Sequence, residues 1–310
     1  MKSFLIKVFL FSAVFITVVI IISTWITYRL SNNSYYRLDK SVKRIFLGHS
    51  HAEAAYSDTI IRNSRNFGQS GESYFYTYQK LQKLLSANPG IQQVFIEFTN
   101  NNLDGEMDQW TIESSYLKFH LKKYGHLIIP REKIFLFKKN PVAYMEAVPV
   151  NLKFFIDYFR TGADFYYTYA DWGSFRASKE SKIDSLRSVW SSRKTDYAGA
   201  SKQLKPSAVH LQTLYNLVFL DSIINYCKNR SVKIVLIRAP QHPEYAGNIN
   251  DSLFHTVRTK LYPTVPFLDF ANFPLTEDCF LDFQHVNQKG SNSLSVILDS
   301  LLTQQYPLSF

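Results

Sequence analysis

The segment Arg44-Ile45-Phe46-Leu47-Gly48-His49-Ser50-His51 gives the clearest indication of the fold. Its apolar residues, which end at a glycine, are typical of a short buried strand followed by a turn. Similar apolar runs occur at Val94–Phe98, Val232–Ile237 and Val265–Phe270. Strands this apolar are typical of a parallel sheet that is buried on both faces.

Helical patterns separate these strands. Tyr74–Leu85 has apolar residues at helical spacing and is followed by Asn88-Pro89-Gly90, which ends a helix. Val209–Cys227 and Leu294–Leu302 show the same periodicity. The alternation predicts an α/β fold, a three-layer α/β/α sandwich with a mainly parallel sheet.

Residues 103–205 interrupt this alternation. A hundred residues is too long for an ordinary loop, so we expect a helical insertion beside the carboxyl edge of the sheet, where α/β folds bind ligands. The insertion is rich in aromatic residues that could stack on sugar rings: Tyr166, Tyr167, Tyr169, Trp172, Phe175 and Trp190.

The first 28 residues predict a membrane anchor. Val8–Ile26 contains 19 residues without a charge, long enough to cross a hydrocarbon core of about 30 Å. Thr24–Tyr28 lacks the small residues of a signal-peptidase site, so the anchor is expected to stay uncleaved. Residues 29–43 are interpreted as a juxtamembrane stalk and residues 44–310 as the α/β domain.

The formal charge of +10 does not indicate nucleic acid binding, because the basic residues are scattered. Their densest cluster (Arg37, Lys40, Lys43 and Arg44) follows the apolar segment and is interpreted as lying near lipid headgroups. By the positive-inside rule, these charges favour a cytoplasmic domain. The two cysteines, Cys227 and Cys279, exclude a disulfide scaffold but leave one disulfide open.

Three residues suggest nucleophilic catalysis. Ser50 follows the first strand, where a serine is exposed at the active edge of the sheet and its own N–H can bind an oxyanion. Asp282 and His285 stand three apart before the last helix, so the carboxylate can orient the imidazole. Two alternatives without a catalytic role remain open. Ser50 could belong to an ordinary turn, and Asp282 could be the N-cap of a helix with His285 on the surface.

The order of these segments resembles the SGNH/GDSL hydrolase family. Ser50 matches the nucleophile of that family, and Asp282 and His285 match its last block. By the same resemblance Gly71 is the oxyanion glycine, with Gly68 as the alternative. The third-block amide is assigned to Asn101, with Asn100 as the alternative.

The opening Gly48-His49-Ser50-His51 is similar to a membrane-anchored branch of the family, which includes the D-alanine transfer protein of teichoic acid modification and exopolysaccharide O-acetyltransferases. This resemblance implies a domain outside the inner membrane and a serine esterase or O-acyltransferase that acts on a cell-envelope or exported glycan. His49 departs from the usual Asp, and the usual glycine before the third-block Asn is absent.

These departures leave open a non-catalytic alternative, a glycan-binding domain or a scaffold for a membrane acyltransferase. A cytoplasmic lipid esterase is a third alternative, if the charge rule sets the topology. His51, Arg238 and His242 are candidates for substrate binding. No cofactor is expected. A metal site at His49 and His51, with His285, is disfavoured because no carboxylate stands at ligand spacing.

Overall fold

The computed structural model describes residues 2–31, 36–103, 106–148, 160, 175–187, 215–245 and 251–304. The chain divides into two compact units, of which the first comprises Met1–Arg37 and Ile112–Ala170. The second comprises Leu38–Thr111 and Asp171–Phe310 and contains the whole sheet. Each unit is described by itself.

The second unit is built on five parallel strands in the order β2-β1-β3-β4-β5. Their bounds are β1 Arg44–Leu47, β2 Ser64–Asn66, β3 Gln93–Glu97, β4 Lys233–Arg238 and β5 Phe267–Asp269. This order is that of one common class of doubly wound sheets, in which ligands bind beyond the carboxyl ends of the strands. The α/β fold expected from the sequence is therefore confirmed.

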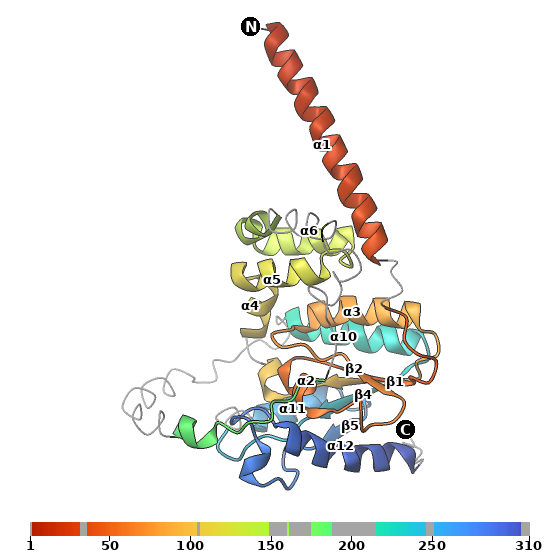
Figure 1. The fold of residues 1–310 in the computed structure, drawn as a ribbon, viewed down its shortest axis with the longest axis vertical. Coiled ribbons are helices and arrows are strands. Elements are labelled where there is room, and N and C mark those ends of the chain that lie inside the picture. Colours follow the sequence, from red (N-terminus) through yellow and green to blue (C-terminus); the bar gives the residue numbers. More distant parts are fainter. Residues whose placement is uncertain are drawn as a thin grey trace. The chain divides into compact units, whose positions relative to one another are not determined.

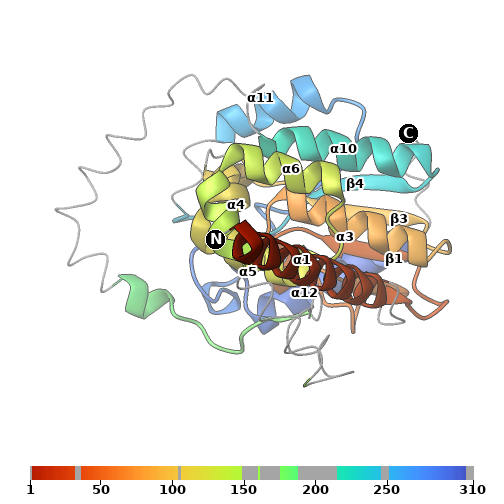
Figure 2. The same ribbon diagram turned by 90° about the horizontal axis from the view of Figure 1, so that it is seen from above.

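Helices cover both faces of the sheet (Figure 1). On one face lie α2 (Ser50–Ala55) and α12 (Gln288–Thr303), which share a core with strand residues such as Phe46 and Phe95. On the other face α3 (Tyr74–Ala87) packs against α10 (Tyr215–Asn229), and Figure 2 shows these two helices nearly side by side. The unit thus has the three layers that the sequence predicted.

Other elements lie near the strand ends or within the insertion. They are the 3₁₀ turns η2 (Asn100–Leu103) and η6 (Glu277–Cys279), and the helices α4 (Glu106–Ile112), α5 (Ser114–Tyr124), α6 (Pro130–Lys139) and α11 (Asp251–Leu261). The described part of the insertion is thus mainly helical. Of its aromatic residues singled out above, only Phe175 lies within the described residues.

Some boundaries differ from the sequence expectations. The last helix begins six residues before Leu294, at Gln288, because the Asn287 side chain accepts hydrogen bonds from two N–H groups of its first turn. The short strand β2 was not expected, since its exposed Arg65 interrupts any apolar pattern. Cys227 and Cys279 are both free thiols, so the open disulfide alternative does not occur in this structure.

In the first unit, α1 (Lys2–Ser31) extends three residues beyond the expected anchor boundary. Its 30 residues give a length of about 45 Å, and by length and composition the helix can cross a membrane. Apolar side chains along most of the helix are exposed, for example Phe9 and Phe11, whereas Ile26 and Leu30 near its end are fully buried. The exposed apolar surface is what a lipid-facing helix requires.

Candidate active site

Ser50 lies at the carboxyl edge of the sheet, just after the end of β1. Ile45, Phe46 and Leu47 are fully buried in β1, and the chain then turns at Gly48 into α2, which begins at Ser50. Gly48 has a φ of +147°, and a Cβ there would lie 2.4 Å from the Cβ of Glu97. A glycine is therefore required where β1 passes β3 just before the serine.

A short loop brings the other two residues to the serine. An antiparallel bridge joins Phe280 to Val286, and the N–H of Leu281 donates to the carbonyl of His285 at 2.9 Å. Asn287 closes the loop by donating from Nδ2 to the carbonyl of Asp278 at 2.7 Å while it caps α12. This tight turn fixes the segment that contains Asp282 and His285.

Ser50, His285 and Asp282 form a continuous hydrogen-bonded series. The Oγ of Ser50 lies 2.7 Å from Nε2 of His285. On the other side of the ring, Nδ1 lies 2.9 Å and 3.0 Å from the two carboxylate oxygens of Asp282. With the proton on Nδ1, the imidazole presents Nε2 as an acceptor for the serine hydroxyl, which is the arrangement of a nucleophile with its general base.

Asp282 is held as a carboxylate. Its burial raises the pKa, but hydrogen bonds from His285 and from the N–H groups of Gln284 and His285 outweigh that effect and leave the pKa below its usual value. The side chains of Asp282 and His285 keep 30% and 20% of their exposure. The pair is thus reachable from solvent.

The two asparagine candidates for the oxyanion site differ in burial and in the hydrogen bonds of their amides. Asn100 is buried, and both ends of its amide are bonded: Nδ2 donates to Asp251 at 2.7 Å and Oδ1 accepts from Arg238 at 2.6 Å. Asn101 is half-buried, and its Oδ1 accepts from the hydroxyl of Tyr245. This bond turns the donor end of the Asn101 amide away from Tyr245, which favours Asn101 over Asn100.

The two candidate glycines also differ. Gly68 packs against the backbone of α2, where a Cβ would lie 2.3 Å from the nitrogen of Glu53. Gly71 has a φ of +74° with open space around a Cβ. The neighbouring Ser70 N–H donates to Glu53 at 2.7 Å, so this turn is tied to the helix that begins at Ser50.

The three residues proposed for substrate binding are all buried. His51 and Arg238 are each 1% exposed and His242 is 4% exposed. The guanidinium of Arg238 lies 2.6 Å from Asp251 and stacks over Phe254, and His242 packs against Phe280 and Phe283. In this structure the three side chains therefore face the interior of the second unit.

Glu97 is a residue that the sequence analysis missed. It is fully buried at the end of β3, where its Oε1 lies 2.8 Å from Nε2 of His49 and 3.4 Å from Nδ1 of His51. Its Oε2 accepts from the N–H of Ala52 at 3.0 Å, which secures the first turn of α2. The signal for this residue was a carboxylate inside the otherwise apolar run Val94–Phe98.

A model of an uncharacterised family matches residues 196–307, about a third of the chain. The matched region includes Asp282 and His285 and leaves Ser50 outside. A search of curated proteins finds no match to this chain.

Proposed function

We propose that this chain is a membrane-anchored serine enzyme of the SGNH type, an esterase or O-acyltransferase that acts on a cell-envelope or exported glycan. The observation that supports the proposal most is the distance of 2.7 Å between the Oγ of Ser50 and Nε2 of His285. It is supported further by Asp282 on the far side of the imidazole, at 2.9 Å.

In the acylation step, Ser50 attacks the carbonyl carbon of an acyl ester while His285 takes the hydroxyl proton. The protonated imidazole is stabilised by the Asp282 carboxylate. The same proton then passes to the leaving alkoxide, so the first alcohol departs and the acyl group is bound to Ser50. Water or a glycan hydroxyl then attacks the acyl-enzyme while His285 accepts its proton. His285 passes this proton to the departing Oγ of Ser50, so the acyl–serine bond breaks and the free acid or the acylated glycan is released.

The negative charge that develops on the carbonyl oxygen during attack must be stabilised by hydrogen-bond donors. The candidates are the backbone N–H groups of Ser50 and Gly71 and the side-chain amide of Asn101. Loss of one such donor typically costs about 2.7–4 kcal/mol of transition-state stabilisation. The acyl group that we propose is removed or transferred is a small one, such as acetyl.

The proposal is tested with a fluorophosphonate, which phosphonylates an activated serine. Full-length protein in detergent should be labelled once, and intact-mass and peptide analysis should place the adduct on Ser50. Ser50→Ala should abolish labelling, whereas Ser293→Ala, which changes an exposed serine of α12, should not. An unlabelled wild-type protein that is folded by circular dichroism would favour the non-catalytic glycan-binding or scaffold alternative.

We also propose that the α/β domain lies outside the inner membrane, with α1 as its single anchor. Protease added to intact spheroplasts should then digest the domain. Protection until detergent is added would place the domain in the cytoplasm and would rule out an external glycan as substrate.

A further inference from the structure

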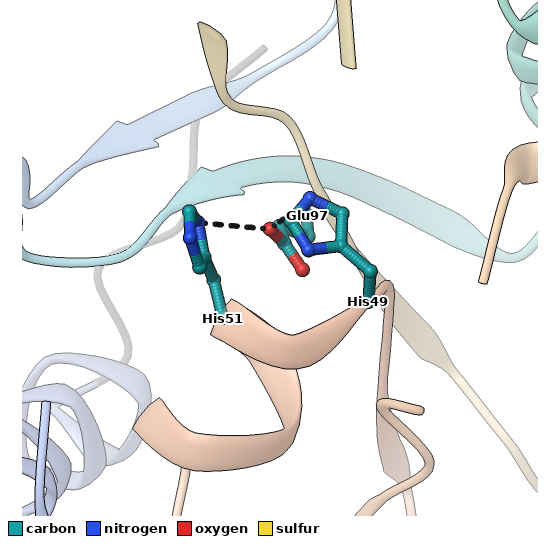
Figure 3. A group of neighbouring side chains, drawn as sticks. All are labelled: His49, His51 and Glu97. Atoms are coloured by element: carbon teal, nitrogen blue, oxygen red, sulfur yellow. Dashed lines mark ion pairs between the residues drawn. The ribbon is translucent and has the colours of Figure 1, made fainter. Parts of the chain in front are cut away.

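A second cluster of titratable side chains lies beside the triad. It consists of His49, His51 and Glu97, which come from the turn after β1, the first turn of α2 and the end of β3 (Figure 3). The carboxylate of Glu97 lies between the two imidazole rings (Figure 3). We call these three residues the His49–His51–Glu97 cluster.

The geometry of the cluster is that of a set of converging ligands. One ligand atom from each residue lies within 4.8 Å of the other two, and the side chains are 0–1% exposed. Within the described residues Nε2 of His49, Nδ1 of His51 and Oε1 of Glu97 have no hydrogen bond of acceptable geometry, although they lie at ion-pair distance. Three buried polar atoms that face one another in this way indicate a shared partner.

The buried carboxylate of Glu97 also favours a bound cation. A buried carboxylate costs several kcal/mol unless a positive charge compensates it. A cation bound between Glu97 and the two imidazoles would supply that charge. A neutral imidazole is the form that binds metal ions.

We propose that the His49–His51–Glu97 cluster binds one divalent transition-metal ion of the zinc type, through Nε2 of His49, Nδ1 of His51 and Oε1 of Glu97. Zinc binds imidazole nitrogen and carboxylate oxygen at about 2.0–2.2 Å, so tetrahedral ligands stand about 3.3 Å apart. The observed separations of 2.8 Å and 3.4 Å from Oε1 bracket that value. Two imidazoles disfavour calcium and magnesium, which prefer oxygen ligands.

A metal ion bound in the cluster would also affect the nucleophile Ser50 through His49. This effect rests on the function proposed above. Nδ1 of His49 lies 3.4 Å from the Oγ of Ser50. With Nε2 bound to the metal, the ring proton must stay on Nδ1, which then points a donor toward the serine oxygen. The metal site itself does not depend on any reaction at Ser50.

The test uses full-length protein in detergent, purified with a tag that contains no histidine. After removal of metal and addition of Zn²⁺, dialysed wild-type protein should retain one equivalent by elemental analysis. Co²⁺ should produce visible absorption bands that Zn²⁺ abolishes. Glu97→Gln and His51→Asn should each weaken Zn²⁺ binding by more than about 100-fold. A loss of about 100-fold is the upper end of what is seen when a residue that only hydrogen-bonds to a metal ligand is replaced.

Two controls separate this proposal from the previous one. Ser50→Ala should keep the full metal equivalent while it loses fluorophosphonate labelling. His242→Gln, which changes another buried histidine of the same unit, should also keep the metal. Wild-type protein that retains less than a tenth of an equivalent and gives no Co²⁺ bands overturns the metal site, whether or not Ser50 is labelled. If folded Glu97→Gln protein retains as much Zn²⁺ as the wild type, the assigned ligands are wrong.

Discussion

The Oγ of Ser50 lies 2.7 Å from Nε2 of His285, although the two residues are 235 positions apart in the chain. The contact joins the end of the first strand to the loop before the last helix. It is produced by the winding of the sheet, which places both segments at the carboxyl edge.

Ser50→Ala should abolish turnover of a small acyl ester and change the free energy of unfolding by less than about 1 kcal/mol, because the hydroxyl contributes little packing. His285→Ala should lose nearly as much activity, and the double variant little more, since triad members act as a unit. Initial rates and urea unfolding measure both effects. Full activity of Ser50→Ala would eliminate the serine mechanism.

Asp282→Asn should lower kcat by about 10⁴-fold, the loss seen when an amide stabilises the wrong histidine tautomer. The same substitution has a pH signature in stability. Because the pKa of Asp282 is depressed in the folded protein, its carboxylate stabilises the fold above the ordinary value of 3.8, and that contribution is lost as pH falls through the folded pKa. The difference in unfolding free energy between wild type and Asp282→Asn should therefore shrink below pH 3.8. A gap that stays constant from pH 7 to pH 3 would contradict the assignment.

Lys80→Met should destabilise the second unit strongly. Nζ of Lys80 lies 2.7 Å from Glu72, both side chains are fully buried, and the lysine also donates to the Phe67 carbonyl. Removal of one partner leaves a buried uncompensated charge, at a cost of about 3–5 kcal/mol. Denaturant unfolding measures this loss. The double variant Lys80→Met/Glu72→Leu should recover much of it, and an equally unstable double variant would show that the charge is not the cause.

Cys227 should resist alkylation in the folded protein. Burial raises the pKa of its thiol to about 12, so almost no thiolate forms at pH 8. Iodoacetamide at pH 8, followed by mass spectrometry, should leave Cys227 unmodified in buffer. In guanidinium chloride without reductant, Cys227 and Cys279 should both react, whereas a disulfide between them would prevent both modifications.

Gly48→Ala should impair both folding and the active site. The added Cβ would collide with Glu97 at a backbone φ that only glycine adopts readily. We expect a lower unfolding midpoint and a loss of fluorophosphonate labelling larger than the loss of folded protein explains. Gly90→Ala is the matched control, because a Cβ there meets only the end of Lys43 at 3.6 Å. An unchanged Gly48→Ala protein would show that β1 and β3 have room to separate.

The class of the fold could be predicted from the sequence, because apolar runs that end at glycine and helical periodicity are local properties of the chain. The sequence also indicated Ser50, Asp282 and His285, since strand ends and the spacing Asp-x-x-His are visible in one dimension. The apolar length of residues 8–26 was sufficient to predict the helix that can cross a membrane.

The contacts that distinguish the candidate side chains come from distant segments and could not be predicted from the sequence. Asn100 and Asn101 are neighbours with the same amide, and only the contacts with Asp251, Arg238 and Tyr245 distinguish them. Arg238, a candidate for substrate binding in the sequence, is buried where its strand end faces acidic residues from distant segments. The carboxylate that histidines 49 and 51 lacked in sequence is supplied by Glu97 of the adjacent strand, since parallel pairing brings together residues that no local pattern connects.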